Sequence, residues 1–373
     1  MQRRLRSQIV LLTATVALCL SIAACKPAPV MNETEKNTMN ELTQEMQTHC
    51  VGRYLIDLPK DFEVGTRQAV GYKREVVIET LGKMTESGFN TYMQQIEAEY
   101  KVKKNRRQKI SYFFSTSKPT TDSQIFERIK DDEEPIDSRL IEGYKWSNGI
   151  ALKMVVAATE SSLENREDAA STIKTGLDVS QRKKYITGLL ARLRSRETTE
   201  IPKEPGFCFD GGFLSGKAGE GKELEIDEEF GAGGVFKTHP DVSFTFNSYT
   251  AFREKTTLLE RQLNKLVENK HGRLLRQGAV KLAGVPQAEE FLMEGEQDYF
   301  ELVDGKRVRG HYFTMQGNSK IGSPQTPLFN LTMETANIVS KTENSPNLTK
   351  GPSLSDAQAT ALWDAISRTI RLR

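Results

Sequence analysis

The chain lacks the excess of positive charge that nucleic-acid-binding proteins need. It holds 52 lysines and arginines against 50 acidic residues, and three of the arginines lie in an N-terminal segment that we predict to be removed. Because nucleic-acid binders cluster basic side chains on one surface, this nearly neutral balance predicts no nucleic-acid partner.

The chain also lacks a second long hydrophobic run after its N-terminal segment. The remaining sequence has an ordinary apolar content, which predicts a water-soluble folded body. Its length of about 350 residues favours two domains over one.

Clusters of catalytic or metal-binding residues are missing as well. The histidines are His49, His239, His271 and His311, and no two of them stand at helical ligand spacing or beside a cysteine pair. No G-x-S-x-G nucleophile motif is present. The glycine-rich segment 216–222 lacks the spacing of a phosphate-binding loop, and the glycines at 231–234 predict an ordinary loop. We therefore expect no metal, no cofactor and no enzymatic activity.

Only four cysteines are present, and two of them have predicted fates that remove them from pairing. Cys19 lies in the predicted leader, and Cys25 is a predicted lipidation site. Cys50 and Cys208 remain, and in an oxidising compartment they are natural disulfide partners. A bridge between them would close a long loop, worth about 5 kcal/mol as an upper estimate. Two buried free thiols are the alternative.

What the N-terminus does contain is the pattern of an exported lipoprotein. Three arginines precede an apolar stretch at 9–20 that is too short to span a bilayer comfortably, which is typical of an export signal. Ala23 and Ala24 suit a signal peptidase pocket, and Cys25 follows where bacterial lipoproteins carry their lipid. We predict a signal peptide over 1–24 and lipidation of Cys25, several acyl chains together anchoring the protein. A simple secretory signal is the alternative.

The residues after the anchor predict where the protein resides. An aspartate after the lipidated cysteine is the usual signal for inner-membrane retention, and Lys26 stands there instead. We therefore expect a periplasmic protein anchored to the inner leaflet of the outer membrane. Residues 25–45 are polar and nearly free of aromatics, so they predict a flexible tether.

Residues 46–200 predict an N-terminal α+β domain. Alternation over 50–59 predicts one strand that ends at Pro59. Asn148-Gly149 predicts a type I′ hairpin turn, because both residues tolerate positive φ. The other expected elements are helices over 89–100 and 186–193 and strands over 110–115, 124–129, 140–146 and 150–157.

Residues 201–373 predict a second domain with the same order of elements. Asp304-Gly305 predicts another hairpin turn, and Ser355 with Gln358 has capping-box spacing. The expected elements are helices over 252–266 and 355–370 and strands over 206–214, 223–227, 242–246, 279–282, 288–293, 299–303, 307–314 and 328–335. Helix, antiparallel meander and helix, occurring twice, predict an α+β fold of two tandem domains, each an antiparallel β-sheet packed with helices.

Two segments carry a resemblance to a known family. They are HCVGRYLIDLP at 49–59 and PGFCFDGGF at 205–213, each at the start of a predicted domain. With the lipoprotein signal, they resemble the immunity proteins that neutralise type VI secreted phospholipase effectors. The resemblance extends over residues 46–373 in order and length.

The resemblance implies a membrane-tethered periplasmic inhibitor whose partner is a cognate type VI phospholipase effector. In that family the two domains grip the lipase, and blocking of lid opening or of substrate access is the implied mechanism. Such a protein needs no active site. A bridge between Cys50 and Cys208 would, as a hypothesis, limit hinge motion between the domains and reduce the cost of ordering on binding.

Two other functions stay open at this stage. One is a lipoprotein binding module in envelope assembly, and the other is a hydrolase with an unrecognised site. Residues that bind the partner are unknown, since the family's binding loops vary with their effectors. Trp146 is eligible as an interface anchor, but a packed position in the sheet is the more ordinary role.

Overall fold

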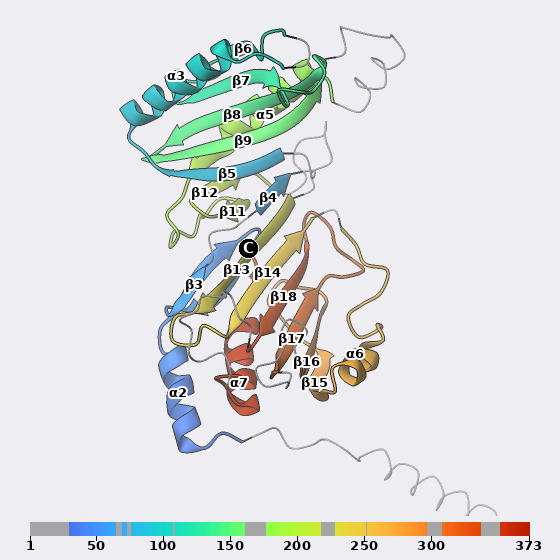
Figure 1. The fold of residues 1–373 in the computed structure, drawn as a ribbon. Coiled ribbons are helices and arrows are strands. Elements are labelled where there is room, and N and C mark those ends of the chain that lie inside the picture. The colour runs from blue at the N-terminus through green and yellow to red at the C-terminus, as the bar shows by residue number, and fades with distance from the viewer. Residues whose placement is uncertain are drawn as a thin grey trace, which may run out of the picture.

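Two lobes, each an antiparallel sheet with helices, make up the protein, as the sequence predicts (Figure 1). The computed structural model describes residues 30–64, 69–72, 76–106, 109–160, 177–217, 228–250, 252–296, 308–336 and 351–373. The predicted signal peptide, Cys25, the strands over 223–227 and 299–303 and the Asp304-Gly305 turn lie outside these residues.

The helices are α2 (Glu33–Thr43), α3 (Glu86–Val102), α5 (Val179–Arg192), α6 (Leu263–Asn269) and α7 (Asp356–Ser367). The strands are β1 (Met46–Val51), β2 (Tyr54–Pro59), β3 (Phe62–Val64), β4 (Ala69–Tyr72), β5 (Val76–Lys83), β6 (Phe113–Ser117), β7 (Ser123–Ile129), β8 (Ser138–Ser147), β9 (Ile150–Thr159), β10 (Leu193–Ser195), β11 (Gly206–Phe209), β12 (Gly212–Ser215), β13 (Glu228–Phe236), β14 (Ser243–Tyr249), β15 (Arg273–Ala279), β16 (Ala288–Glu296), β17 (Arg309–Gly317), β18 (Leu328–Glu334) and β19 (Arg371–Leu372).

The upper lobe in Figure 1 is a meander of β6 to β9, with β5 paired to β9, between two helices. On one face α3 packs its aromatic side chains on the sheet, with Tyr92 and Tyr144 in edge contact. On the other face α5 lies so close that a Cβ on Gly143 would meet Ile186 at 2.6 Å. The predicted turn between β8 and β9 is present, with φ of 45° at Asn148 and 84° at Gly149.

A buried charge cluster fixes α3 on its face of the sheet. The hydroxyl of Tyr100 on α3 donates to Glu142 at 2.7 Å, and Arg128 donates to the same carboxylate at 2.9 Å. Burial alone would raise the pKa of Glu142, but its hydrogen bond to Arg128 and the charge of that guanidinium hold the pKa below its usual range. The carboxylate therefore stays ionised and paired beneath the helix.

The lower lobe is built on the antiparallel strands β13 to β18, with α7 against one face. The indole of Trp363 on α7 is fully buried, stacks on Phe244 and donates to Glu290 at 2.9 Å. The predicted capping box of Ser355 and Gln358 opens this helix. A second layer, the sheet β1-β2-β19, lies against the same face, where Tyr54 contacts Phe246 and Phe329.

The first described residues, with α2, β1 and β2, belong to the lower lobe, which also contains the C-terminal strand β19 (Figure 1). The prediction of a flexible tether up to residue 45 is wrong for 33–43, which form α2. Asn32 caps this helix through a capping box, and Met39 and Leu42 are buried where it packs near α7. The sequence reasoning missed it because only two apolar residues mark its buried face.

Two predicted strands are hairpins instead. The segment 50–59 turns back on itself at Gly52, where φ is +57°, so that β1 pairs with β2. The segment 206–214 turns at Gly211, with φ of +67°, so that β11 pairs with β12. In each case a glycine with positive φ turns the chain, whereas the alternation of apolar and polar residues alone predicts one continuous strand.

Two further predictions in the second half are wrong. Of the expected helix over 252–266 only 263–266 is helical, as the start of α6; before it the chain follows an irregular path in which the N–H of Glu254 donates to the carbonyl of Ser319. The glycines at 231–234 lie inside β13, not in a loop, because pairing with strands on both sides determines their conformation.

One pairing joins the two lobes, and we call it the seam. Residues Glu228–Gly231 of β13 pair antiparallel with Ala69–Tyr72 of β4, and β4 pairs with β5 of the upper lobe. The main strands of both lobes therefore form a single sheet in the order β15-β16-β17-β18-β14-β13-β4-β5-β9-β8-β7-β6, with β3 also on β13, while β1-β2-β19 and β10-β12-β11 are separate small sheets.

The packing of α2 yields a test of where the folded body begins. Leu42→Ala should lower the free energy of unfolding by about 2–3 kcal/mol, because the side chain is buried against the lower lobe. Glu41→Ala, one position away and exposed, should change it by less than about 0.5 kcal/mol. Equal urea midpoints for both variants and the wild type would mean that this segment is a tether after all.

Candidate functional site

A disulfide lies next to the seam, between the two lobes. Cys50 on β1 is bonded to Cys208 on β11, with 5.7 Å between their Cα atoms, which is one of the two states that the sequence left open. Beside it Gly52 and Cys208 exchange both backbone hydrogen bonds at 2.9 Å. Both cysteines are buried.

The disulfide connects the lobes because β11 is held by the upper lobe. The small sheet β10-β12-β11 continues directly from α5. Thr80 on β5 donates to the carbonyl of Asp210, and Ser215 donates to the carbonyl of Arg192 at the end of α5. Since Cys50 lies in the lower lobe, the covalent bond fixes one lobe to the other.

The last residue of the chain reinforces the same junction. The guanidinium of Arg373 lies 3.7 Å from the sulfur of Cys50, 3.8 Å from that of Cys208, and over the ring of Phe213. It donates to the backbone carbonyls of Pro202, Glu204 and Gly206. The C-terminal strand of the lower lobe is therefore tied to the segment that leads into β11.

Helices and strands cover one face of the common sheet from end to end. On this back face lie α5 in the upper lobe and α7 with the β1-β2-β19 layer in the lower lobe. The apolar side chains of the sheet that point this way are buried, for example Ile78 and Phe230. The back face is thus the main core of the protein.

Among the residues that the structure describes, the opposite face is covered at its two ends. Helix α3 covers the strands at the far edge of the upper lobe. In the lower lobe Leu258 and the side chains of α6 cover Phe291 and Met293 of β16. Between these ends lies what we call the open face, which crosses the seam from β9 to β18. Its residues are Val77, Glu79, Lys153, Val155, Ala157, Glu229, Gly231, Gly233, Thr245, Asn247, Tyr249, Asn330 and Thr332.

The register shows that the open face is continuous across the lobes. Val77 pairs with Val155 on one side and with Gly71 on the other, and Gly71 pairs in turn with Glu229 and so with Tyr249. Directly paired residues share a face of the sheet. The side chain of Val77 is 51% exposed, an unusual state for a valine near the middle of a large sheet.

The glycines of β13 keep the open face low near the seam. Gly231 and Gly233 add no side chains there, and a Cβ on Gly231 would meet the amide oxygen of Asn247 at 2.8 Å. On the back face, a Cβ on Gly234 would collide with the backbone of Glu63 on β3. The polar side chains of Asn247 and Thr245 therefore lie beside these glycines and form this part of the open face.

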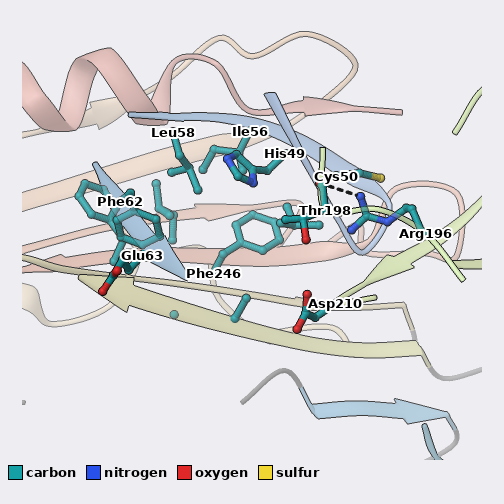
Figure 2. Close-up of a pocket in the computed structure, with 15 residues that line it drawn as sticks. His49, Cys50, Ile56, Leu58, Phe62, Glu63, Arg196, Thr198, Asp210 and Phe246 are labelled. Carbon is teal, nitrogen blue, oxygen red and sulfur yellow. Dashed lines mark hydrogen bonds between the residues drawn. The ribbon is translucent and has the colours of Figure 1, made fainter. Parts of the chain in front are cut away.

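A cavity of about 420 Å³ lies on the back side, between the sheet and the layer of β1 to β3. Figure 2 shows Arg196, Thr198 and Asp210 toward one end of it and Phe62 and Glu63 at the other. The remaining lining residues are His49, Cys50, Val51, Ile56, Leu58, Ala232, Gly233, Phe244, Phe246 and Leu331.

The histidines are separate from one another in the structure. His311 is buried, contacting Thr335 and Asp356, whereas His239 and His271 contact Ser353 and Glu296 at the surface. His49 lines the cavity.

Over the described ranges, no three His, Cys, Asp or Glu side chains group in a way that could hold a metal ion. Nor does any described helix have the length and apolar character to cross a membrane.

Trp146 takes the ordinary role that the sequence allowed for it. Its indole donates to the carbonyl of Met84 at 2.7 Å and packs beside the aromatic cluster under α3. The open face itself was missed by the sequence reasoning. The only indication of the open face in the local sequence is β5, a strand that has a valine at one of its outward-facing positions.

The disulfide generates a quantitative prediction. Replacing both residues, Cys50→Ala with Cys208→Ala, should lower the free energy of unfolding by about 2–5 kcal/mol, because the bond constrains a long loop of the unfolded chain. Urea unfolding of oxidised protein measures this. In excess reductant the difference from the wild type should shrink, and identical oxidised midpoints would contradict the prediction.

Two family models match this chain, one after the other along the sequence. Residues 47–196 match the N-terminal domain of Tle cognate immunity protein 4, and residues 200–373 match its C-terminal domain. No curated protein matches this chain.

Solved structures share the fold over nearly their whole length. The apo immunity protein TplEi of the type VI secretion system (T6SS) from Pseudomonas aeruginosa is 25% identical, with a TM-score of 0.66 over 88% of this chain and 97% of that one. A chain of the Tle4–Tli4 complex is 24% identical, with a TM-score of 0.68 over 89% and 98%. Because the two family models together span the folded body, this chain belongs to the Tle cognate immunity protein 4 family.

Proposed function

We propose that this protein binds and inhibits a cognate type VI secreted phospholipase in the periplasm. Membership of an immunity family supports this, and a solved structure of similar fold is described as a Tle4–Tli4 complex. The observation that carries the proposal is the open face, which the register of the described strands continues across both lobes.

The open face suits a large protein partner better than a small molecule. A stable complex buries about 1,200 Å² or more, and a sheet surface spanning two lobes supplies such an area without a deep cleft. Exposed Val77 and half-buried Val155 and Tyr249 offer apolar contact at its centre. The lobes on either side of the seam would both contact the enzyme and keep its lid closed or block its substrate entrance.

The disulfide supports this mechanism by fixing the lobes before the partner arrives. Binding by obstruction is costly if two lobes must first be ordered relative to each other. The Cys50–Cys208 bond and the seam hold them in one arrangement, so less free energy is lost on binding. Inhibition of this kind requires no chemistry, and we expect no turnover of any substrate.

Lipidation of Cys25 would keep the inhibitor close to the substrate of its target. Helix α2 begins at Glu33, so seven residues, and therefore eight Cα–Cα steps, separate the folded body from the anchor. Fully extended, they reach at most about 29 Å. An anchor of this length holds the body near the outer membrane, where a phospholipase would act.

The proposal predicts protection of living cells. Periplasmic expression of the cognate type VI lipase should lyse cells, and co-expression of this protein should restore growth. Phospholipid hydrolysis, followed by thin-layer chromatography, should fall with it. Persistent toxicity despite abundant exported protein would refute the pairing. Turnover of an envelope substrate by the protein alone would favour the hydrolase alternative.

A charge in the middle of the open face should weaken the complex. Val77→Glu should reduce affinity for the lipase at least about tenfold, because a carboxylate would be buried against the partner without a counter-charge. Val30→Glu makes the same change at an 88% exposed residue near α2 and should leave affinity unchanged. Calorimetric titration measures both. Equal affinities would move the interface elsewhere.

The proposed anchor is tested by fractionation. Cys25→Ser should release the protein into the soluble periplasmic fraction and remove labelling by radioactive palmitate. Protection should weaken at low expression and recover at high expression, because the anchor acts only by raising the local concentration. Membrane association of Cys25→Ser equal to that of the wild type would overturn the lipoprotein assignment.

A further inference from the structure

The cavity on the back side is partly open to solvent and measures about 420 Å³. That volume falls within the range of small-molecule binding pockets, about 300–1,000 Å³, which are mostly apolar with a few polar groups. The walls include Ile56, Leu58, Phe244, Phe246 and Leu331 and have this character.

The polar end of the cavity contains an incompletely satisfied cation. Arg196 is only 4% exposed, and its terminal nitrogens donate to the backbone carbonyls of Glu197, Thr198, Glu200 and Phe209. Its Nε atom is buried, and no atom of the described chain accepts from it. A buried donor without a partner costs free energy, and a bound acceptor would recover it.

The surroundings indicate that the missing acceptor is an anion. Burial lowers the pKa of His49, and the charge of Arg196 lowers it further, against an opposing effect of Asp57. Positive potential therefore reaches the interior of the cavity, although Asp210 at the same end offsets part of it. At the far end the carboxylate of Glu63 disfavours an anion (Figure 2). Only one orientation of a charged ligand is favourable.

We propose that this cavity binds a long-chain fatty acid, with the carboxylate at Arg196 and the acyl chain along the apolar wall formed by β2 and the back face of β14. An elongated apolar pocket with one cationic end matches a single chain with one anionic head. The proposal does not depend on the partner of the open face, because the cavity lies on the other side of the sheet.

The test uses the full chain with Cys25→Ser, exported so that the disulfide forms, and stripped of lipid. Palmitate should displace the fluorescent fatty acid cis-parinaric acid, and native mass spectrometry should show one palmitate per protein. Hexadecanol, which has the same chain without the charge, should bind at least about tenfold more weakly. Lyso-phosphatidylethanolamine, the other single-chain lipid of the envelope, should also bind more weakly. Equal or tighter binding of either would overturn the assignment of a fatty carboxylate.

Two variants separate the cavity from the surface. Ala232→Phe projects a ring into the cavity and should abolish palmitate binding, whereas Ala157→Phe on the exposed side of β9 should not. Arg196→Met should retain hexadecanol binding and lose the preference for palmitate, a change in selectivity that simple misfolding cannot produce. Unchanged binding by Ala232→Phe, or unchanged preference by Arg196→Met, would refute the proposal. No lipase is present in these assays, so their failure would leave the proposed inhibition untouched.

Discussion

The structure depends on the pairing of β13 with β4. Without this seam the two lobes would be separate sheets, joined at one side by the disulfide and the Gly52–Cys208 pairing. With it they share backbone hydrogen bonds, one register and one pair of faces. Because a sheet pairs its strands edge to edge, the side that is open in one lobe is open in the other. The continuous open face is therefore a consequence of a single four-residue pairing.

The chain path makes this junction resistant to opening. The first strands of the chain pack on the lower lobe, the next enter the upper lobe, and the chain returns to end against the first strands. Separating the lobes would require breaking the seam, the Gly52–Cys208 pairing and the disulfide together. Arg373 adds a charged contact that joins the end of the chain to the same place. Rigidity between the lobes thus comes from several bonds across a small area.

The sequence correctly predicted the elements that short-range interactions determine. The helices α3, α5 and α7, the Asn148-Gly149 hairpin and the α+β class follow from periodicity, capping and turn residues. The seam, the open face and the position of α2 did not, because each depends on strands or helices far apart in sequence. The two hairpins were predicted as single strands for a related reason: Gly52 and Gly211 turn the chain where the alternation of apolar and polar residues continues. The cavity arises from the layering of two sheets, which no local pattern encodes.

The two faces of the common sheet have different roles. The back face buries the apolar side chains and carries nearly all the covering layers, so that it supplies the stability. The residues of the open face do not pack in this core, so they need only be compatible with a strand. A protein that must match a particular partner gains from this arrangement, because substitutions on the open face change recognition with little effect on the core. The same scaffold can therefore accommodate different partner surfaces, while the seam and the disulfide hold both lobes in place.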